Sequence, residues 1–346
     1  MRQLKLLALK ILQAGGAFAW TARSRWRQQR LLILCYHGIS LRDEHEWDPL
    51  LFLSPEVFES RLRQIRDGGY RVLGLGEALT RLREGTLPPR AVAITFDDGN
   101  HDFYARAFPL LEKYGFPATV YQTTYYTDFN RPVFRLICDY MMWQRRGTVR
   151  GENPWDGQPF DLRTPGSRAA AVEQLDQYAT QQQGLTGLQK DELAKRIAGQ
   201  MGVDWDELTA SRILQLMSWP EIQDLAWRGI DFQLHTHRHF TPQEEVPFLR
   251  ELNDNSERLT QHLNYQATHF CYPCGVHYTN YPNWLRQWGA TSAVLCDRGL
   301  AQRQDDVMLI PRLLDTMSLT PLEFDGWLSG LAHYLPQRSN HAVATD

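Results

Sequence analysis

The chain has 346 residues, a formal net charge of -3 and 43% hydrophobic residues. This length suits one large domain, and the composition is that of proteins that bury a packed core. The small net charge excludes the strong positive field that draws a protein to nucleic acid. The five cysteines are too few and too scattered for a disulfide framework, which favours a reducing compartment.

The first 30 residues combine an apolar stripe with basic residues. Leucine or isoleucine recurs at positions 4, 6, 7, 9, 11 and 12, interrupted by Lys5 and Lys10, and four arginines follow between positions 23 and 30. The uninterrupted apolar span of about 20 residues that a transmembrane helix needs is absent. Residues 1–30 therefore predict a basic amphipathic helix in peripheral contact with an anionic membrane, on the cytoplasmic side of the inner membrane.

Two alternatives for this segment stay open. In the first, the helix packs on the main domain or lies free in solvent. In the second, residues 17–19, Ala-Phe-Ala, are the small-residue cleavage site of an export signal. Lys10 inside the apolar stripe and the basic residues beyond it argue against export.

From residue 31 onward, apolar runs alternate with helical patterns. Strands are expected over residues 31–36, 70–75, 91–96, 118–122, 230–234, 269–272 and 292–296. Helices are expected over residues 54–69, 76–84, 103–114, 219–229, 251–263, 282–289 and 321–331. This alternation predicts an α/β fold with a parallel sheet covered by helices, either a barrel or an open doubly wound sheet.

The alternation stops between residues 125 and 218. This stretch has a Pro/Gly-rich segment at residues 151–166 and amphipathic helical runs at residues 169–178 and 190–201, with no strand signal. It predicts a mostly helical insertion within a main domain of residues 31–335, which a flexible tail at residues 336–346 follows. Trp143, Trp155 and Trp205 of the insertion either stack on sugar rings or belong to its core.

Two polar clusters follow buried strands. Asp97 and Asp98 end one strand, and Gly99 turns the chain away, a pattern that in isolation is most often a solvated turn. His235 and His239 follow another strand, four residues apart, so both can reach one ion. Because both strands belong to one sheet, the clusters should meet and form a two-histidine, one-carboxylate site for a divalent metal. One aspartate should then bind the metal while the other acts as general base.

These runs, TFDDG and HTxxH, resemble the first two motifs of the polysaccharide deacetylases related to chitooligosaccharide deacetylase. The resemblance implies a distorted parallel (β/α) barrel and a divalent metal, zinc. It also implies that Asp97 is the catalytic base and that Asp98, His235 and His239 are the metal ligands.

Residues 34–40, LCYHGIS, resemble the first strand of a circularly permuted subgroup that includes the bacterial poly-N-acetylglucosamine deacetylases. In that subgroup the strand that carries the catalytic acid comes first, which implies that His37 protonates the leaving amine. The alternative is a buried histidine that bonds to backbone groups. His333 imitates the usual C-terminal acid motif, but it falls in a predicted helix, so His37 is preferred.

The third motif departs from the family. Here Cys271 stands in the place of an arginine and Cys274 in the place of an aromatic residue. A backbone N–H at Cys274 can still hold an oxyanion, and Tyr272 and Arg312 are predicted to belong to the oxyanion and substrate-binding region with it. Arg298 or Arg312 is expected to orient Asp97 in place of the missing arginine.

The function predicted from the sequence is a metal-dependent hydrolase that removes an N-acetyl or similar N-acyl group from an amino sugar. The substrate would be a cell-envelope glycan or a lipid-linked saccharide. The Cys271/Cys274 pair suggests an alternative, a thiol-disulfide oxidoreductase, although no helix start follows it to activate a thiol. A catalytically idle glycan-binding barrel is disfavoured by the complete set of metal ligands, and the sequence gives no sign of oligomeric state.

Overall fold

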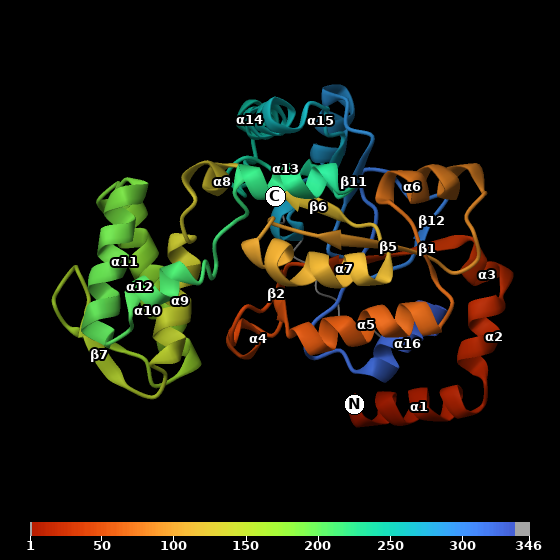
Figure 1. Ribbon diagram of the computed structural model, residues 1–346, viewed down its shortest axis with the longest axis horizontal. Coiled ribbons are helices and arrows are strands. Elements are labelled where there is room, and N and C mark those ends of the chain that lie inside the picture. Colours follow the sequence, from red (N-terminus) through yellow and green to blue (C-terminus); the bar gives the residue numbers. More distant parts are fainter. Residues whose placement is uncertain (1, 336–346) are drawn as a thin grey trace.

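The computed structural model describes residues 2–335, so the predicted tail at residues 336–346 lies outside the described residues. At the centre is a curved sheet in which six parallel strands lie in the order β11-β10-β9-β6-β5-β1 (Figure 1). These strands are β1 (Arg30–Tyr36), β5 (Ala91–Phe96), β6 (Thr119–Gln122), β9 (Asp231–Leu234), β10 (His269–Cys271) and β11 (Ser292–Val294).

Residues 310–314 join the two edges of this sheet. Ile310 bridges in parallel to Val294 of β11, and β13 (Leu313–Leu314) pairs in parallel with Leu34 and Cys35 of β1. At the other end of β1, β12 (Ala301–Gln302) pairs antiparallel with it, while β4 (Arg71–Val72) pairs with the start of β5. The sheet therefore curls into a distorted parallel barrel, and the predicted fold class is confirmed.

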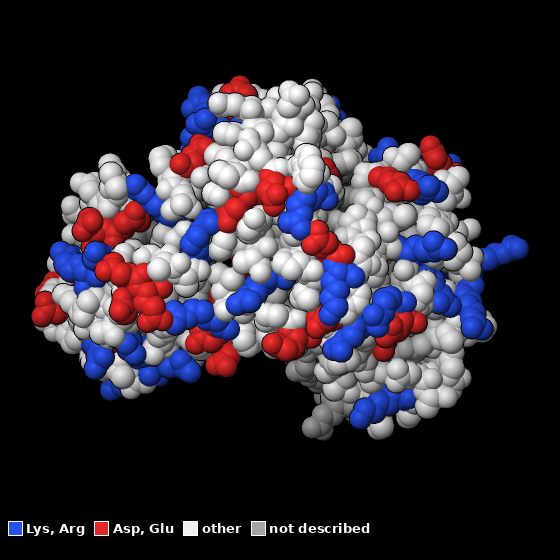
Figure 2. Space-filling model, in the orientation of Figure 1, with Lys and Arg blue, Asp and Glu red and all other residues white. Residues whose placement is uncertain are grey.

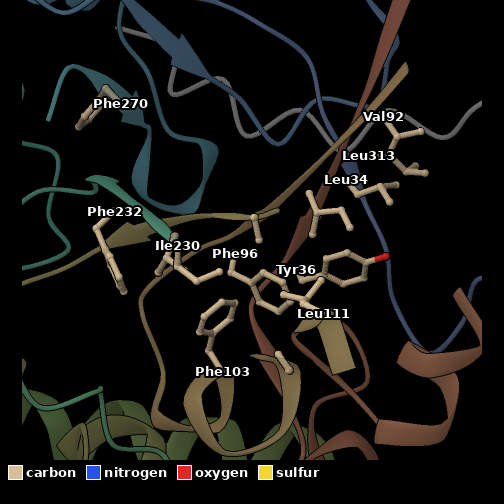
Figure 3. Packing of buried hydrophobic residues seen from close by; sticks show 14 of the residues in the cluster. Leu34, Tyr36, Val92, Phe96, Phe103, Leu111, Ile230, Phe232, Phe270 and Leu313 are labelled. Carbon is tan, nitrogen blue, oxygen red and sulfur yellow. The ribbon is translucent and has the colours of Figure 1, made fainter. Parts of the chain in front are cut away.

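Alternate residues of the strands enter two different cores. In β1, Leu32, Leu34 and Tyr36 join a cluster with the surrounding helices, whereas Leu31 and Ile33 join a cluster inside the barrel. In β5, Phe96 belongs to the outer cluster, which Figure 3 shows around Phe103 and Tyr36. This period of two fixes which side chains at the strand ends point into the barrel mouth.

Helices cover the outside of the barrel. Helix α5 begins at Pro55, and the Ser54 hydroxyl caps it by accepting a hydrogen bond from the Val57 N–H. The covering helices are α5 (Pro55–Asp67), α7 (Phe108–Tyr114), α13 (Trp219–Trp227), α14 (Glu245–Leu263), α15 (Tyr281–Trp288) and α16 (Pro321–Ser329). Helix α6 (Leu75–Glu84) instead packs its buried face against the inner cluster. A π-helical turn, Phe103–Ala107, precedes α7, and 3-10 turns occupy Pro273–Gly275 and Leu331–Tyr334.

A loop begins at the carboxyl end of β1. It contains α4 (Glu44–Trp47) and a short parallel pair, β2 (Gly38–Ile39) with β3 (Phe52–Leu53). Trp47 of this loop lies edge-to-face with Tyr140 of the inserted segment, at a ring separation of 5.6 Å. The loop therefore connects the barrel mouth with the insertion.

The insertion forms a lobe beside the barrel, at the left of Figure 1. Its helices are α8 (Tyr125–Phe129), α9 (Phe134–Gln144), α10 (Pro165–Gln177), a π-helical turn (Tyr178–Gln182), α11 (Gly187–Met201) and α12 (Trp205–Ala210). It has its own apolar core, in which Trp143, Trp155 and Trp205 pack. The structure also contains a hairpin, β7 (Val149–Glu152) with β8 (Pro159–Asp161), that the sequence analysis missed because its first strand is largely exposed and has no apolar alternation.

The amino-terminal segment forms three helices rather than the single helix expected. These are α1 (Arg2–Ala14), α2 (Ala17–Arg23) and α3 (Arg25–Gln28). Helix α1 packs against α16, and its Leu9 is buried. Arg27 is fully buried and donates to the carbonyls of Leu328, Arg30 and Ala91. No described helix is both long enough and apolar enough to cross a bilayer.

Candidate metal centre and active site

The carboxyl ends of the parallel strands converge on one layer of polar side chains. Each of these residues continues the inward-facing alternation of its strand or of the segment at residues 310–314. The layer consists of Cys35, Asp97, Tyr121, His235, Cys271, Cys296 and Arg312. This is the end of a parallel barrel at which catalytic groups are normally found.

Asp98, His235 and His239 form a compact group of three potential metal ligands. The Asp98 Oδ1 atom lies 3.3 Å from His235 Nε2 and 3.2 Å from His239 Nε2. Oxygen and nitrogen ligands at about 2.1 Å from a tetrahedral ion lie about 3.4 Å apart, which matches this spacing. Oδ1 is buried and accepts no hydrogen bond from any described residue, so the site supplies an oxygen that a cation would satisfy.

The imidazole of His235 is oriented by a second contact. Its Nδ1 lies 2.9 Å from the Cys271 carbonyl, which can only accept, so Nδ1 carries the proton. The neutral imidazole in this tautomer presents the lone pair of Nε2 toward Asp98 and the proposed metal position. The donor set fits a divalent ion with open positions for water and substrate.

The turn after β5 has the conformation that a DDG sequence allows. Asp98 has φ 70°, in the left-handed region that aspartate tolerates better than most residues. Gly99 has φ 82°, and a Cβ placed there would lie 1.9 Å from Gln122 Oε1. Both the dihedral and the lack of space require glycine, and the turn directs the Asp98 side chain toward the two histidines.

The histidine loop is held by residues that the sequence analysis did not single out. Asn255 of α14 accepts a hydrogen bond from the His235 N–H and donates to Thr124, whose hydroxyl contacts His237 Nδ1. Glu251 of α14 accepts from the N–H of Arg238 and pairs with its guanidinium at 2.6 Å. Their positions inside a long amphipathic helix gave no signal, because only the tertiary fold brings α14 to the loop.

Asp97 is held by Arg312 in a buried, two-pronged ion pair. Both Arg312 terminal nitrogens donate to the carboxylate at 2.7 Å, and one of them also donates to the Thr95 hydroxyl. Although burial raises the pKa of Asp97, the guanidinium outweighs it and holds that pKa well below its usual range. Of the two arginines expected to orient Asp97, Arg312 lies at the carboxylate, whereas Arg298 is exposed.

His37 approaches Asp97 Oδ2, the same oxygen that accepts from Arg312 Nη2. Its Nε2 is 3.9 Å from Asp97 Oδ2, too long for a hydrogen bond, and its side chain is partly exposed. Its Nδ1 is buried and has no hydrogen-bond partner among the described residues. His333 lies elsewhere, in the turn after α16, with its ring 5.5 Å from that of Trp26. The structure therefore brings His37 to the site and leaves His333 out.

The three residues assigned to oxyanion and substrate binding have different surroundings. Cys274 is exposed in the turn after β10, at φ 56°. Partial burial of its thiol, followed by the negative charge of Asp98, raises the pKa of that thiol to about 11. Tyr272 faces the outer core, fully buried, and donates its hydroxyl hydrogen to the Met308 carbonyl. Arg312 is fully buried against Asp97. Neither side chain is exposed, and the assignment of Tyr272 and Arg312 to substrate binding stays a prediction.

The thiol-disulfide alternative finds no support in this geometry. Cys271 and Cys274 are both free thiols, and Cys271 is fully buried with its sulfur 3.0 Å from Arg312 Nη2. Burial raises the pKa of both thiols, and only a 3-10 turn follows Cys271, so no helix amino terminus activates either one.

The polysaccharide deacetylase family model matches residues 84–144 and 187–293. The chain belongs to the polysaccharide deacetylase family. The matched segments of this family member contain Asp97, Asp98, His235 and His239, and they leave out the part of the insertion that carries the hairpin. The family expected from the two motifs is thereby confirmed.

The relatives of this deacetylase family member include enzymes of the expected subgroup. The Escherichia coli (strain K12) poly-beta-1,6-N-acetyl-D-glucosamine N-deacetylase is 28% identical over 98 residues, 28% of this chain and 14% of that protein. The protein of the same name from Staphylococcus aureus (strain MSSA476) is 37% identical over 67 residues, 19% of this chain and 23% of that protein. The aligned segments thus span 14% to 31% of the curated relatives.

Among solved structures, the Streptococcus pyogenes deacetylase PplD in complex with acetate is similar to this family member over most of both chains. The TM-score is 0.56 at 18% sequence identity, and the match covers 85% of this chain and 96% of that chain. At this identity the similarity establishes the fold, a deacetylase-type barrel.

Proposed function

We propose that the chain is a metal-dependent hydrolase that removes the acetyl group from N-acetylglucosamine units of a cell-envelope glycan or lipid-linked saccharide. The observation that carries the proposal is the buried Asp98 Oδ1, which has no hydrogen-bond partner among the described residues and faces two histidine nitrogens. Beside it lies a second carboxylate, Asp97, that Arg312 holds in an ion pair. The names of the relatives support N-acetylglucosamine as the sugar.

In the proposed mechanism, Asp97 accepts the proton of the attacking water and His37 donates a proton to the amide nitrogen as the amine leaves. Asp98, His235 and His239 would hold a divalent ion, for which zinc is the best fit to this ligand set. Because Arg312 makes Asp97 a weak base, the water must be acidified, and that Lewis-acid chemistry is what a bound divalent ion supplies. The backbone N–H of Cys274 is the proposed donor to the developing oxyanion.

The metal assignment is tested by removing its ligands. His235→Ala or His239→Ala should lower bound zinc and acetate release together by well over tenfold, since even outer contacts of a metal site are worth about 10–100-fold. His262→Ala is the matched control, because this histidine stacks on Trp219 at 3.9 Å, away from the ligands. Elemental analysis that finds full zinc occupancy in the His235/His239 double variant would contradict the assignment.

We propose further that the protein binds peripherally to the inner face of the inner membrane through α1. Leu9 packs inward, whereas Leu7 and Ile11, one turn apart, are 55% and 64% exposed, and Lys10 beside them is exposed. Trp20 of α2 is 76% exposed. Figure 2 shows a mostly uncharged surface at the lower right, where α1 lies in Figure 1. An apolar helix face with flanking cations suits an anionic bilayer.

Membrane attachment is best tested by substitution. Deleting residues 1–29 would remove Arg27 and its three carbonyl contacts, and so would disturb the barrel itself. The double variant Leu7→Gln/Ile11→Gln should bind anionic phosphatidylglycerol vesicles at least about tenfold more weakly in sedimentation assays, because it removes buried apolar area. Leu188→Gln, equally exposed at 65% but in the insertion, should bind as the parent does.

Two outcomes would contradict attachment through α1. One is undiminished vesicle binding by the double variant, and the other is recovery from cells of a periplasmic chain that has lost its first residues. The second outcome would support the export-signal alternative.

A further inference from the structure

Three cysteine side chains surround the Asp97–Arg312 pair. The Sγ atoms of Cys35 and Cys271 lie 3.5 and 3.4 Å from Asp97 Oδ2. Arg312 Nη2 lies 3.0 Å from Cys271 Sγ and 3.7 Å from Cys296 Sγ. The deacetylation mechanism uses none of these sulfur atoms, although each of them lies beside the proposed base or the arginine that holds it.

Cys296 differs from the other two in exposure and in charge. Cys35 and Cys271 are fully buried, whereas Cys296, which follows β11, is partly open to solvent. A hydrogen bond from Cys35, supported by Arg312, outweighs burial and lowers the pKa of Cys296 to about 6. Cys296 is therefore the thiol of this cluster that combines access with thiolate character, the two requirements for reaction with oxidants.

The remaining cysteines provide internal comparisons. Cys274 is more exposed than Cys296, but burial of its sulfur raises its pKa to about 11. Cys138 is fully enclosed in the core of the insertion, and burial raises its pKa further. A reaction governed by exposure would select Cys274, whereas one governed by the cluster around Arg312 would select Cys296.

We propose that Cys296 is a modification site at which hydroperoxides oxidise the protein and thereby inhibit the reaction at Asp97. The thiolate sulfur attacks the terminal peroxide oxygen, the O–O bond breaks and an S–O bond forms. Sulfur loses two electrons, and the peroxide is reduced to an alcohol, or to water from hydrogen peroxide, after its leaving oxygen takes up a proton. Two equivalents of a thiol reverse the change, giving the Cys296 thiol, a disulfide of the reductant and water.

The oxidised sulfur would act on catalysis through Arg312. Its added oxygen is a strong acceptor next to Nη2, the nitrogen that donates to Asp97 Oδ2 at 2.7 Å. Competition for this donor would weaken the two-pronged hold on Asp97 and misorient the base. This inhibitory effect rests on the proposed function, whereas the oxidation of Cys296 does not.

The first experiment measures the chemistry without any activity assay. The zinc-loaded full-length chain is alkylated with iodoacetamide at pH 7, or treated with hydrogen peroxide and a sulfenate-specific dione, and each cysteine is followed by mass spectrometry. Cys296 should react about tenfold faster than Cys274 or more, because thiolate fraction controls the rate. Cys35→Ala should slow labelling of Cys296. Faster labelling of Cys274 than of Cys296 would overturn the proposal.

The second experiment connects the modification with catalysis. Peroxide should reduce acetate release by the parent and by Cys138→Ser about tenfold, and dithiothreitol should restore it. The activity of each protein after peroxide treatment is compared with the activity of the same protein before treatment. Cys296→Ser should lose less than half of its acetate-release activity under these conditions. Equal inactivation of Cys296→Ser, or full labelling of Cys296 without loss of activity in an active parent, would overturn the inhibitory role. An inactive parent whose Cys296 is still labelled would instead contradict the deacetylase function alone.

Discussion

Asp97→Asn is expected to lower kcat for acetate release by about 10²–10⁴-fold while bound zinc stays at the level of the parent. The asparagine keeps the shape of the side chain but cannot accept the proton of the attacking water, and general-base catalysis contributes about this factor. Zinc should remain because its proposed ligands are Asp98, His235 and His239, whereas both oxygens of Asp97 accept hydrogen bonds from Arg312. Elemental analysis and single-turnover acetate release measure the two effects separately.

Asp98→Asn is the matched variant, one residue along the same turn. It removes a charged ligand whose Oδ1 lies 3.3 Å or less from both histidine nitrogens. Zinc and activity should therefore fall together, and excess zinc should partly restore activity in Asp98→Asn but not in Asp97→Asn. Equal loss of zinc from the two variants would contradict the division of roles between the two carboxylates.

Much of the site could be predicted because strand periodicity places side chains before any contact is known. Asp97 continues the inward series of Ala91, Ala93 and Thr95, and Cys35 continues that of Leu31 and Ile33. The parallel alternation of strands and helices brings all strand ends to one face. The same parity places Cys35 and Cys296 in the barrel mouth, although neither was among the predicted site residues.

Other features could not be read from the chain because tertiary contacts alone create them. Asn255 supports His235 from the middle of α14, a helix that also begins six residues earlier than its apolar pattern suggested. Tyr272 follows β10 directly beside Cys271, yet alternation turns it into the outer core. Arg312 reaches Asp97 because residues 310–314 close the barrel, and no local signal marked that closure.

Arg312→Leu is expected to give the largest change in pH dependence. Burial alone raises the pKa of Asp97, and only the guanidinium holds it low, so the variant should carry a protonated Asp97 at higher pH than the parent. A protonated Asp97 cannot act as a base. The kcat/KM of Arg312→Leu should therefore fall as the pH is lowered through a range in which Asp97 of the parent is fully ionised. Arg312→Lys keeps the positive charge but loses the two-pronged contact. The pH at which its kcat/KM decreases should therefore lie between those of the parent and of Arg312→Leu.

The stability of Arg312→Leu should change with pH in the matching direction. At neutral pH the variant leaves an unpaired buried carboxylate, which costs about 3–5 kcal/mol of unfolding free energy. In the parent, the pKa of Asp97 is lower in the folded state than in the unfolded state. This difference stabilises the fold at pH values above the unfolded-state pKa, and the stabilisation is lost as the pH falls through the acidic range. In the variant the folded pKa is raised instead, so protonation relieves the cost. The difference in unfolding free energy between the parent and Arg312→Leu, measured by urea titration, should therefore become smaller as the pH is lowered toward about 4.

Arg61→Leu separates this positioning role from a purely structural one. Arg61 donates to Asp315 at 3.0 Å in an equally buried pair that belongs to the outer layer between α5 and the end of β13. Its loss should also destabilise the fold by about 3–5 kcal/mol, since it too leaves a buried carboxylate unpaired. Its kcat/KM profile against pH should nevertheless keep the shape of the parent profile, because Asp97 retains Arg312. If both variants shift the profile alike, the effect is one of general stability, and Arg312 does not position the base.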